Sequence, residues 1–147
     1  MLEGKNIALY VTGGVSIYKT VDLMRTLIKK GATVRVAMTT AATEFVSPML
    51  FEKLSKHKVY VDIFADESPE SVSHIDLADW ADLALISPAT ANTIAKMSYG
   101  IADNMVTSAL LATTSPVFVI PAMNENMYAH PATQENIERL KNRGVYL

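Results

Sequence analysis

Short runs of apolar and β-branched residues alternate with longer segments of helical periodicity, and this alternation restricts the possible folds more than any other feature. The short runs lie at residues 7–11, 33–38, 83–86 and 117–120. Helical patterns follow them at 17–28, 48–54, 91–99 and 133–142. Repeated units of buried strand and helix are typical of parallel sheets covered by helices. We therefore predict one α/β domain over residues 1–147, with a doubly wound parallel sheet in a Rossmann-like or flavodoxin-like three-layer sandwich.

Several residues mark the ends of these elements. Gly13 and Gly14 end the first run in a turn, and Gly31 stops the first helix. Ser47 and Pro48 suit the cap and first turn of the second helix. The segment from Asp62 to Ser73 is rich in acidic residues and serine, which predicts a loop-like insertion. Val145 to Leu147 resembles the opening of a further strand.

Composition excludes several classes of function. A net charge of -2 gives no positive field that attracts nucleic acid. The apolar runs are far shorter than the ~20 residues of a membrane-spanning helix. The absence of cysteine excludes disulfides and thiolate metal sites, and no charged leader precedes the first strand. We expect a cytoplasmic protein with no membrane segment, no nucleic-acid partner and no metal.

Small and hydroxyl-bearing residues follow the four expected strands. In a doubly wound sheet these carboxyl ends meet at one edge, where helix N-termini point their N–H groups at ligands. Turn formation by glycine and capping by Ser, Thr and Asn explain any one of these sites better than a ligand does, but they explain the four together poorly. The residues concerned are 12–16 after the first strand, Thr39, Thr40 and Thr43 after the second, Ser87, Pro88, Thr90, Asn92 and Thr93 after the third, and Pro121, Asn124 and Asn126 after the fourth.

The first turn does not match a dinucleotide site. Such a site requires a third glycine after Gly13 and Gly14 and an acidic residue at the end of the second strand. Val15 and Ser16 follow the glycine pair, and the second strand ends in Met38 and Thr39. Hydroxyls in place of the acid favour one phosphate, so a mononucleotide fits better than NAD.

Two longer motifs carry a resemblance to a known family. Residues 87–93 read SPATANT, and residues 121–127 match P-x-M-N-x-x-M at every fixed position. The chain thereby resembles the homo-oligomeric flavin-containing cysteine decarboxylases over nearly its whole length, since residues 12–15, 38–39 and 74–78 also agree. The continuation Tyr128 and 130–134 is closer to the phosphopantothenoylcysteine decarboxylases than to the lantibiotic peptide decarboxylases.

The resemblance implies an FMN cofactor and decarboxylation of 4'-phosphopantothenoylcysteine to 4'-phosphopantetheine in coenzyme A biosynthesis. It implies trimers, or dodecamers built from trimers, with FMN near the subunit contact. His74 would be the catalytic histidine, although capping of a helix near Asp76 is an alternative for it. Asn124 would be catalytic and bind the substrate carboxylate or adjoining amide, and Met127 would line the substrate site. The cofactor residues would be Gly13, Gly14, Val15, Thr39, Thr90, Asn92, Thr93 and Ala122, with Thr39 at the phosphate.

The resemblance also implies the course of the reaction. Loss of CO₂ from an α-amido acid needs an electron sink, which the family obtains by oxidising the cysteine side chain to a thioaldehyde. The family carries a C-terminal substrate clamp whose cysteine protonates the intermediate. This chain ends at Leu147 without a cysteine, so we expect the clamp to belong to a segment that this chain lacks.

Three other functions stay open. A lantibiotic-type peptidyl-cysteine decarboxylase and a flavin prenyltransferase share the expected fold. A flavin-binding subunit that inhibits a phosphatase is the non-enzymatic alternative. Asn124 and His74 together disfavour the last, because a pure binding module needs neither an amide donor nor an imidazole that exchanges protons near neutral pH.

Overall fold

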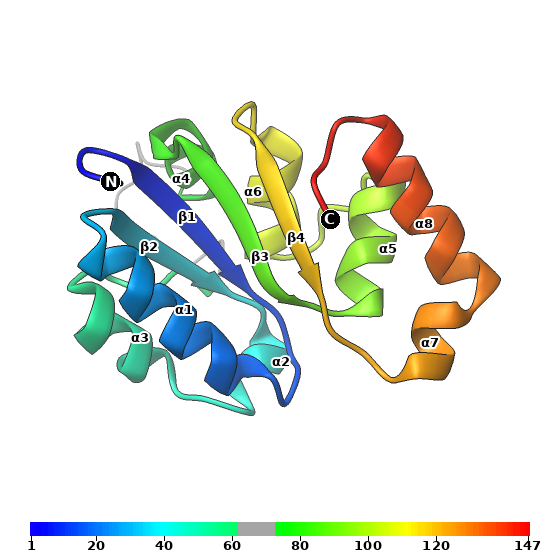
Figure 1. Cartoon of the computed structure of the whole chain (residues 1–147), viewed down its shortest axis with the longest axis horizontal. Helices are drawn as coiled ribbons and strands as arrows, with labels where there is room; N and C mark the ends of the chain where they lie inside the picture. The colour runs from blue at the N-terminus through cyan, green and yellow to red at the C-terminus, as the bar shows by residue number, and fades with distance from the viewer. Residues whose placement is uncertain (62–72) are drawn as a thin grey trace.

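Four parallel strands form the sheet in the computed structural model, which describes residues 1–61 and 73–147 (Figure 1). The strands are β1 (Asn6–Val11), β2 (Thr33–Met38), β3 (Leu83–Ala89) and β4 (Val117–Pro121). Their spatial order is β2-β1-β3-β4, and every neighbouring pair is parallel. The chain leaves β1 for β2 on one side and later returns to β3 on the other, so the strand order reverses between β1 and β3. The predicted doubly wound α/β sheet is confirmed.

Helices cover both faces of the sheet, as the three-layer prediction requires (Figure 1). One face carries α1 (Ile17–Lys29), α2 (Thr40–Thr43) and α3 (Pro48–Ser55), whose Ile17, Met24 and Phe51 join β1 and β2 in one hydrophobic core. The other face carries α4 (Ser73–Trp80), α5 (Ala91–Tyr99), α6 (Met105–Ala112) and α8 (Pro131–Asn142) around a second core. The short helix α7 (Glu125–Ala129) follows β4.

The predicted boundary residues act as expected. Gly31 has a φ of +101°, and a Cβ there would lie 2.8 Å from the Glu3 side chain, so both backbone and space favour glycine after α1. Ser47 accepts a hydrogen bond of 3.2 Å from the N–H of Met49 and caps α3, with Pro48 in its first turn. Tyr146 forms a parallel bridge with Phe118, which agrees with the opening strand expected at 145–147.

Other elements differ from the sequence-based expectation. The helix α6 was not predicted, because its apolar residues surround it and leave no helical period to detect. The strand β3 continues through Ser87 and Pro88 to Ala89, with an irregular register between Ile86 and Ala89. The short helices α2 and α7 were also missed. The loop predicted for Asp62 to Ser73 lies outside the described residues, apart from Ser73, where α4 begins.

Residues 1–61 and 73–147 lack two features that would bear on function. No helix in these ranges is both long and apolar enough to cross a membrane. The same ranges hold no group of three or more His, Asp or Glu side chains arranged to bind a metal ion.

Candidate functional site

A cleft of about 570 Å³ opens where β1, β3 and β4 end. This edge includes the reversal of strand order between β1 and β3, which is where doubly wound sheets bind ligands. Many of the sequence-predicted residues line the cleft, although they come from three separate strand ends. They are Gly13, Gly14, Val15, Thr90, Ala122, Asn124 and Met127.

The glycine pair forms one wall, and its two members face different neighbours. A Cβ on Gly13 would lie 2.9 Å from the Ala41 Cβ, closer than real Cβ contacts, and 3.1 Å from the Ala41 carbonyl carbon, which is also tight. A Cβ on Gly14 would meet only the Pro88 ring, at 3.7 Å. Gly13 therefore lets α2 approach the first turn, whereas Gly14 keeps backbone open toward the cleft.

The segment after β3 forms the second wall. Thr90 caps α5, and its Oγ1 accepts a 3.2 Å hydrogen bond from the N–H of Thr93. Thr90 also lines the cleft, but Thr93 is buried behind it and Asn92 is exposed outside it. The structure thus brings Thr90 to the cleft and leaves Asn92 and Thr93 off its surface.

Thr39 has a local structural role. It caps α2, its Oγ1 accepts a 3.1 Å hydrogen bond from the N–H of Ala42, and its side chain is buried. It does not line the cleft. Capping of α2 accounts for the hydrogen bond that the Thr39 hydroxyl makes. The predicted contact of Thr39 with the cofactor phosphate stays a prediction.

Asn124 caps α7 at the third wall, and the cap fixes the orientation of its amide. Its Oδ1 accepts hydrogen bonds from the N–H groups of Asn126, at 2.8 Å, and Met127, at 3.3 Å. Because two backbone donors require the oxygen on that side, the Nδ2 group points away from the helix. The side chain is exposed and lines the cleft, so a donor is presented to a ligand.

His74 lies in the first turn of α4 and does not line the cleft. The helix begins at Ser73, so the alternative of His74 as a cap before Asp76 is wrong. The carbonyl of Trp80 accepts a hydrogen bond from Asn6 at the amino end of β1. Six residues separate His74 from Trp80, so His74 lies about 9 Å along the axis of α4 from the Trp80 end of the helix, which adjoins the start of β1. Its Nδ1 is buried and has no hydrogen-bond partner among the described residues.

Three further residues line the cleft without having been predicted to bind cofactor or substrate. They are Ser16, Ala91 and Met123, and each adjoins a predicted residue in the sequence. His130 serves helix entry, because its Nδ1 accepts a 3.0 Å hydrogen bond from the N–H of Ala132 at the start of α8.

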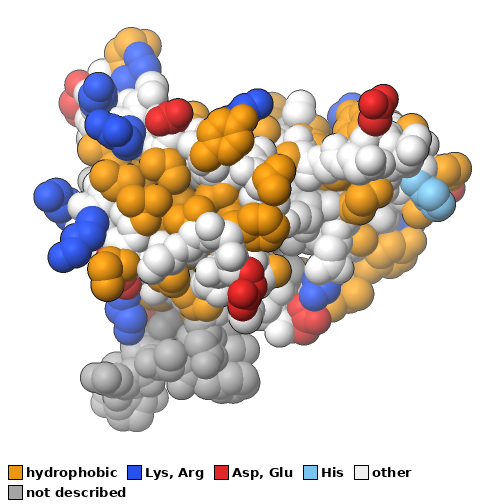
Figure 2. Space-filling model, turned by 90° about the horizontal axis from the view of Figure 1, so that it is seen from below, with side chains coloured by type: hydrophobic (Ala, Val, Ile, Leu, Met, Phe, Trp, Pro, Cys, Tyr) orange, Lys and Arg blue, Asp and Glu red, His pale blue; other side chains and the backbone are white. Residues whose placement is uncertain are grey.

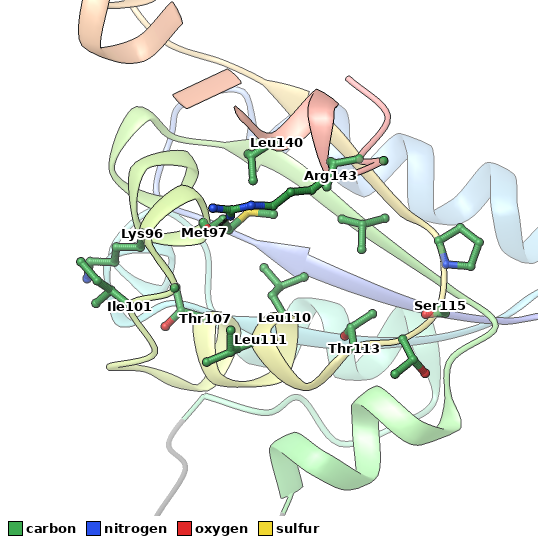
Figure 3. A pocket seen from close by; sticks show the side chains of 16 residues that line it. Lys96, Met97, Ile101, Thr107, Leu110, Leu111, Thr113, Ser115, Leu140 and Arg143 are labelled. Atoms are coloured by element: carbon green, nitrogen blue, oxygen red, sulfur yellow. Dashed lines mark hydrogen bonds between the residues drawn. The ribbon is translucent and has the colours of Figure 1, made fainter. Parts of the chain in front are cut away.

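A second cavity of about 350 Å³ lies between α5, α6 and α8 (Figure 3). Leu110 and Leu140 contribute to its apolar lining, and the Arg143 side chain extends across it. Arg143 donates a 3.4 Å hydrogen bond to the Met97 carbonyl. None of the predicted cofactor or substrate residues lines this cavity.

Exposed hydrophobic side chains occur around the cleft. Figure 2, which views the molecule from below, shows hydrophobic groups spread over much of that face. Val15 is 81% exposed and Met127 is 49% exposed, and both line the cleft. Other exposed large hydrophobic residues on α1, the α2–α3 connection, α3 and α7 are Tyr18, Phe45, Met49, Leu50 and Tyr128.

Comparison with known proteins decides the family. The model of a family described as Flavoprotein matches residues 1–147, the whole chain. The chain belongs to the flavoprotein family. A relative in this family, the coenzyme A biosynthesis bifunctional protein CoaBC of Bacillus subtilis (strain 168), is 51% identical over 144 residues. That match covers 98% of this chain but 36% of the relative, so the chain spans about a third of that protein.

Solved structures of flavin enzymes share the fold. The FMN-dependent cysteine decarboxylase SpaF superposes with a TM-score of 0.94 at 30% identity, covering 99% of this chain and 84% of that one. A PPC decarboxylase complexed with pantothenoylaminoethenethiol superposes with a TM-score of 0.82 at 30% identity, covering 97% of this chain and 80% of that one. The flavoprotein family membership and the fold therefore agree with the resemblance drawn from the motifs.

Proposed function

We propose that this chain binds FMN and decarboxylates 4'-phosphopantothenoylcysteine to 4'-phosphopantetheine, a step of coenzyme A biosynthesis. The observation that carries the proposal is the convergence of the Gly13–Gly14 turn, Thr90 and Asn124 on one cleft from three strand ends. The relative from Bacillus subtilis, named for coenzyme A biosynthesis, supports the pathway. The superposed PPC decarboxylase supports the substrate class.

The cleft fits a flavin mononucleotide. Its volume of about 570 Å³ falls within the range of small-molecule sites, about 300–1,000 Å³. Gly14 allows a flat ring to approach the backbone, and Val15, Ala122 and Met123 offer apolar contacts. Thr90 supplies a hydroxyl at the N-terminus of α5, where N–H groups favour negative charge. Bound here, the flavin supplies the electron acceptor that decarboxylation of this amino acid derivative requires.

Asn124 holds the substrate carboxylate in this proposal. Its Nδ2 donates to one carboxylate oxygen, while its Oδ1 stays engaged by Asn126 and Met127. A neutral donor orients the carboxylate without adding the Coulomb attraction of a fixed cation, and that attraction would stabilise the charged ground state of a group that leaves as CO₂. The helix cap therefore presets the geometry of substrate binding.

His74 exchanges one proton in this proposal. The His74 side chain that serves a given cleft belongs to a neighbouring copy of the chain. Within one chain His74 does not line the cleft, although Val15 and Met127 expose apolar surface at the cleft itself. A trimer or dodecamer that buries this surface brings a second chain to the cleft. Mixing a His74→Asn variant with an Asn124→Asp variant after dissociation should restore part of the activity, because some contacts then pair two intact residues. Activity that stays absent in the mixture contradicts the shared site.

Spectra and product analysis test the proposed function. The purified chain, mixed with FMN and filtered, should keep a flavin absorbance near one equivalent per chain. Incubation with 4'-phosphopantothenoylcysteine should release CO₂, whereas the same compound with the cysteine carboxylate amidated should not react. Lack of retained flavin, or equal product from both compounds, rejects the proposal.

A peptide ending in cysteine is the second candidate substrate. The superposition on the cysteine decarboxylase SpaF favours it, with a TM-score of 0.94 against 0.82 for the PPC decarboxylase. Both substrates present a cysteine carboxylate to Asn124, so the group beyond the cysteine separates them. Comparing kcat/KM for phosphopantothenoylcysteine and for a pentapeptide ending in cysteine decides between the two.

A further inference from the structure

Thr12 joins the two main walls of the cleft without lining it. It follows β1 directly, precedes Gly13, and is 1% exposed. Its Oγ1 donates a 2.5 Å hydrogen bond to the Pro88 carbonyl and accepts a 3.0 Å hydrogen bond from the N–H of Thr90. One buried hydroxyl thus uses both its donor and its acceptor capacity on the segment that ends β3.

The regular strand pairing stops before this point. The residue pairs of β1 and β3 end at Tyr10 and Ile86, and the pairing of β3 with β4 shifts register between Ile86 and Ala89. Pro88 has no N–H to donate across to β1. The Thr12 side chain therefore takes the place of regular ladder bonds between β1 and β3 beyond Tyr10. The Thr12 backbone N–H adds a further link, because it donates to the Pro88 carbonyl at 3.3 Å.

The residues held by Thr12 are those that shape the cleft. On one side Thr12 directly precedes Gly13 in the chain, so it fixes the start of the glycine turn. On the other it fixes Thr90, which caps α5 and lines the cleft. The Pro88 ring lies where a Cβ on Gly14 would contact it, so the two walls already adjoin.

We propose that Thr12 is a positioning residue for the cofactor: its hydroxyl sets the separation of the glycine turn from the α5 N-terminus and thereby the width of the flavin cleft. This inference rests on the proposed function for its ligand. The hydroxyl does not touch the flavin. Its effect on flavin binding passes through Pro88 and Thr90.

The test compares three variants. Thr12→Val keeps the shape but removes the hydroxyl and both of its hydrogen bonds, and it should weaken FMN binding about tenfold. Thr12→Ser keeps the hydroxyl and should bind FMN within about twofold of the wild type. Thr107→Val is the matched control, because Thr107 is 2% exposed and its hydroxyl bonds Asn104 at the start of α6, away from the cleft. It should lower the melting temperature yet leave the FMN dissociation constant unchanged.

Hydrogen exchange separates this inference from flavin binding itself. In the chain without FMN, the Thr90 amide should exchange faster in Thr12→Val than in Thr12→Ser or Thr107→Val. If the wild type binds no FMN but this exchange pattern holds, the proposed function fails and the link between the walls stands. If Thr12→Val and Thr107→Val show the same FMN affinity and the same Thr90 exchange, the positioning role is wrong and Thr12 contributes only stability.

Discussion

Gly13 and Ala41 come so close that a Cβ on Gly13 would lie 2.9 Å from the Ala41 Cβ. Gly13→Ala should therefore push α2 away from the first turn. We expect loss of about 1–3 kcal/mol of stability, typical of overpacking, together with weaker FMN binding. Thermal denaturation without FMN and a flavin fluorescence titration measure the two effects.

Gly14→Ala is the natural comparison for that change. Its Cβ would meet only the Pro88 ring, at the ordinary contact distance of 3.7 Å. Stability without FMN should therefore stay near the wild-type value, while FMN binding should weaken, because Gly14 lines the cleft and a side chain there keeps the flavin from its backbone. Equal losses of stability in the two variants contradict the separate roles given to these glycines.

Asn124 combines a helix cap with a donor for the substrate, and two substitutions separate these roles. Asn124→Asp keeps the acceptor for Asn126 and Met127 and adds a charge suited to a helix N-terminus, so stability should hold. Decarboxylation should fall by about a hundredfold or more, because a carboxylate replaces the donor and repels the substrate. Asn124→Ala should lose the activity and also about 1 kcal/mol of cap stability. The readouts are CO₂ release and urea unfolding.

His74→Asn should leave FMN binding unchanged and reduce turnover by at least about a hundredfold, the usual effect of removing an acid–base group. His74 does not line the cleft of its own chain, and asparagine keeps a polar side chain of similar size where His74 meets the neighbour's cleft, so the cofactor should keep its contacts. Flavin absorbance after gel filtration checks the first expectation and CO₂ release the second. His130→Asn is the control, because His130 caps α8 and asparagine also caps helices. Turnover that survives in His74→Asn removes the catalytic assignment.

Tyr10 should make the protein sensitive to alkali. It is fully buried on β1, and burial raises the pKa of its phenol, an effect that the Thr113 side chain partly offsets. An unfolded tyrosine ionises near pH 10 while the folded one does not, so this contribution to stability is complete below pH ~10 and is lost as the pH rises further. In urea unfolding between pH 9 and 11.5, Tyr10→Phe should lose less stability, by up to about 1.4 kcal/mol per pH unit. Identical slopes for the two proteins contradict this origin.

Expectations that rested on local signals agree with the structure. Ser47 and Pro48 begin α3, Gly31 ends α1, and the four apolar runs form the four parallel strands. Capping and turn formation depend on residues a few positions apart, so the sequence carries them directly. The helix α6 carries no such local signal, because it is apolar on every side. Its helical conformation follows from packing against neighbouring elements, which the sequence does not display.

The sequence predicted part of the candidate site. Residues that directly follow β1, β3 and β4 line the cleft, because parallel strands end at one edge whatever their sequence separation. Thr39 follows β2, yet it caps α2 outside the cleft. Asn92 and Thr93 lie in the first turn of α5 and point away from the cleft, Asn92 toward the exposed side of the helix and Thr93 toward the buried side.

The sequence by itself determined the four strands, their assembly into a parallel sheet and the motifs that identify the family, because periodicity and long motifs are properties of the chain alone. The tertiary structure decided which motif residues share the cleft and how the Asn124 amide is turned. It also decided that a hydroxyl at Thr12 bonds a carbonyl and an amide 76 and 78 residues away. Such contacts depend on the packing of distant segments, and no local pattern in the chain records which segments will meet.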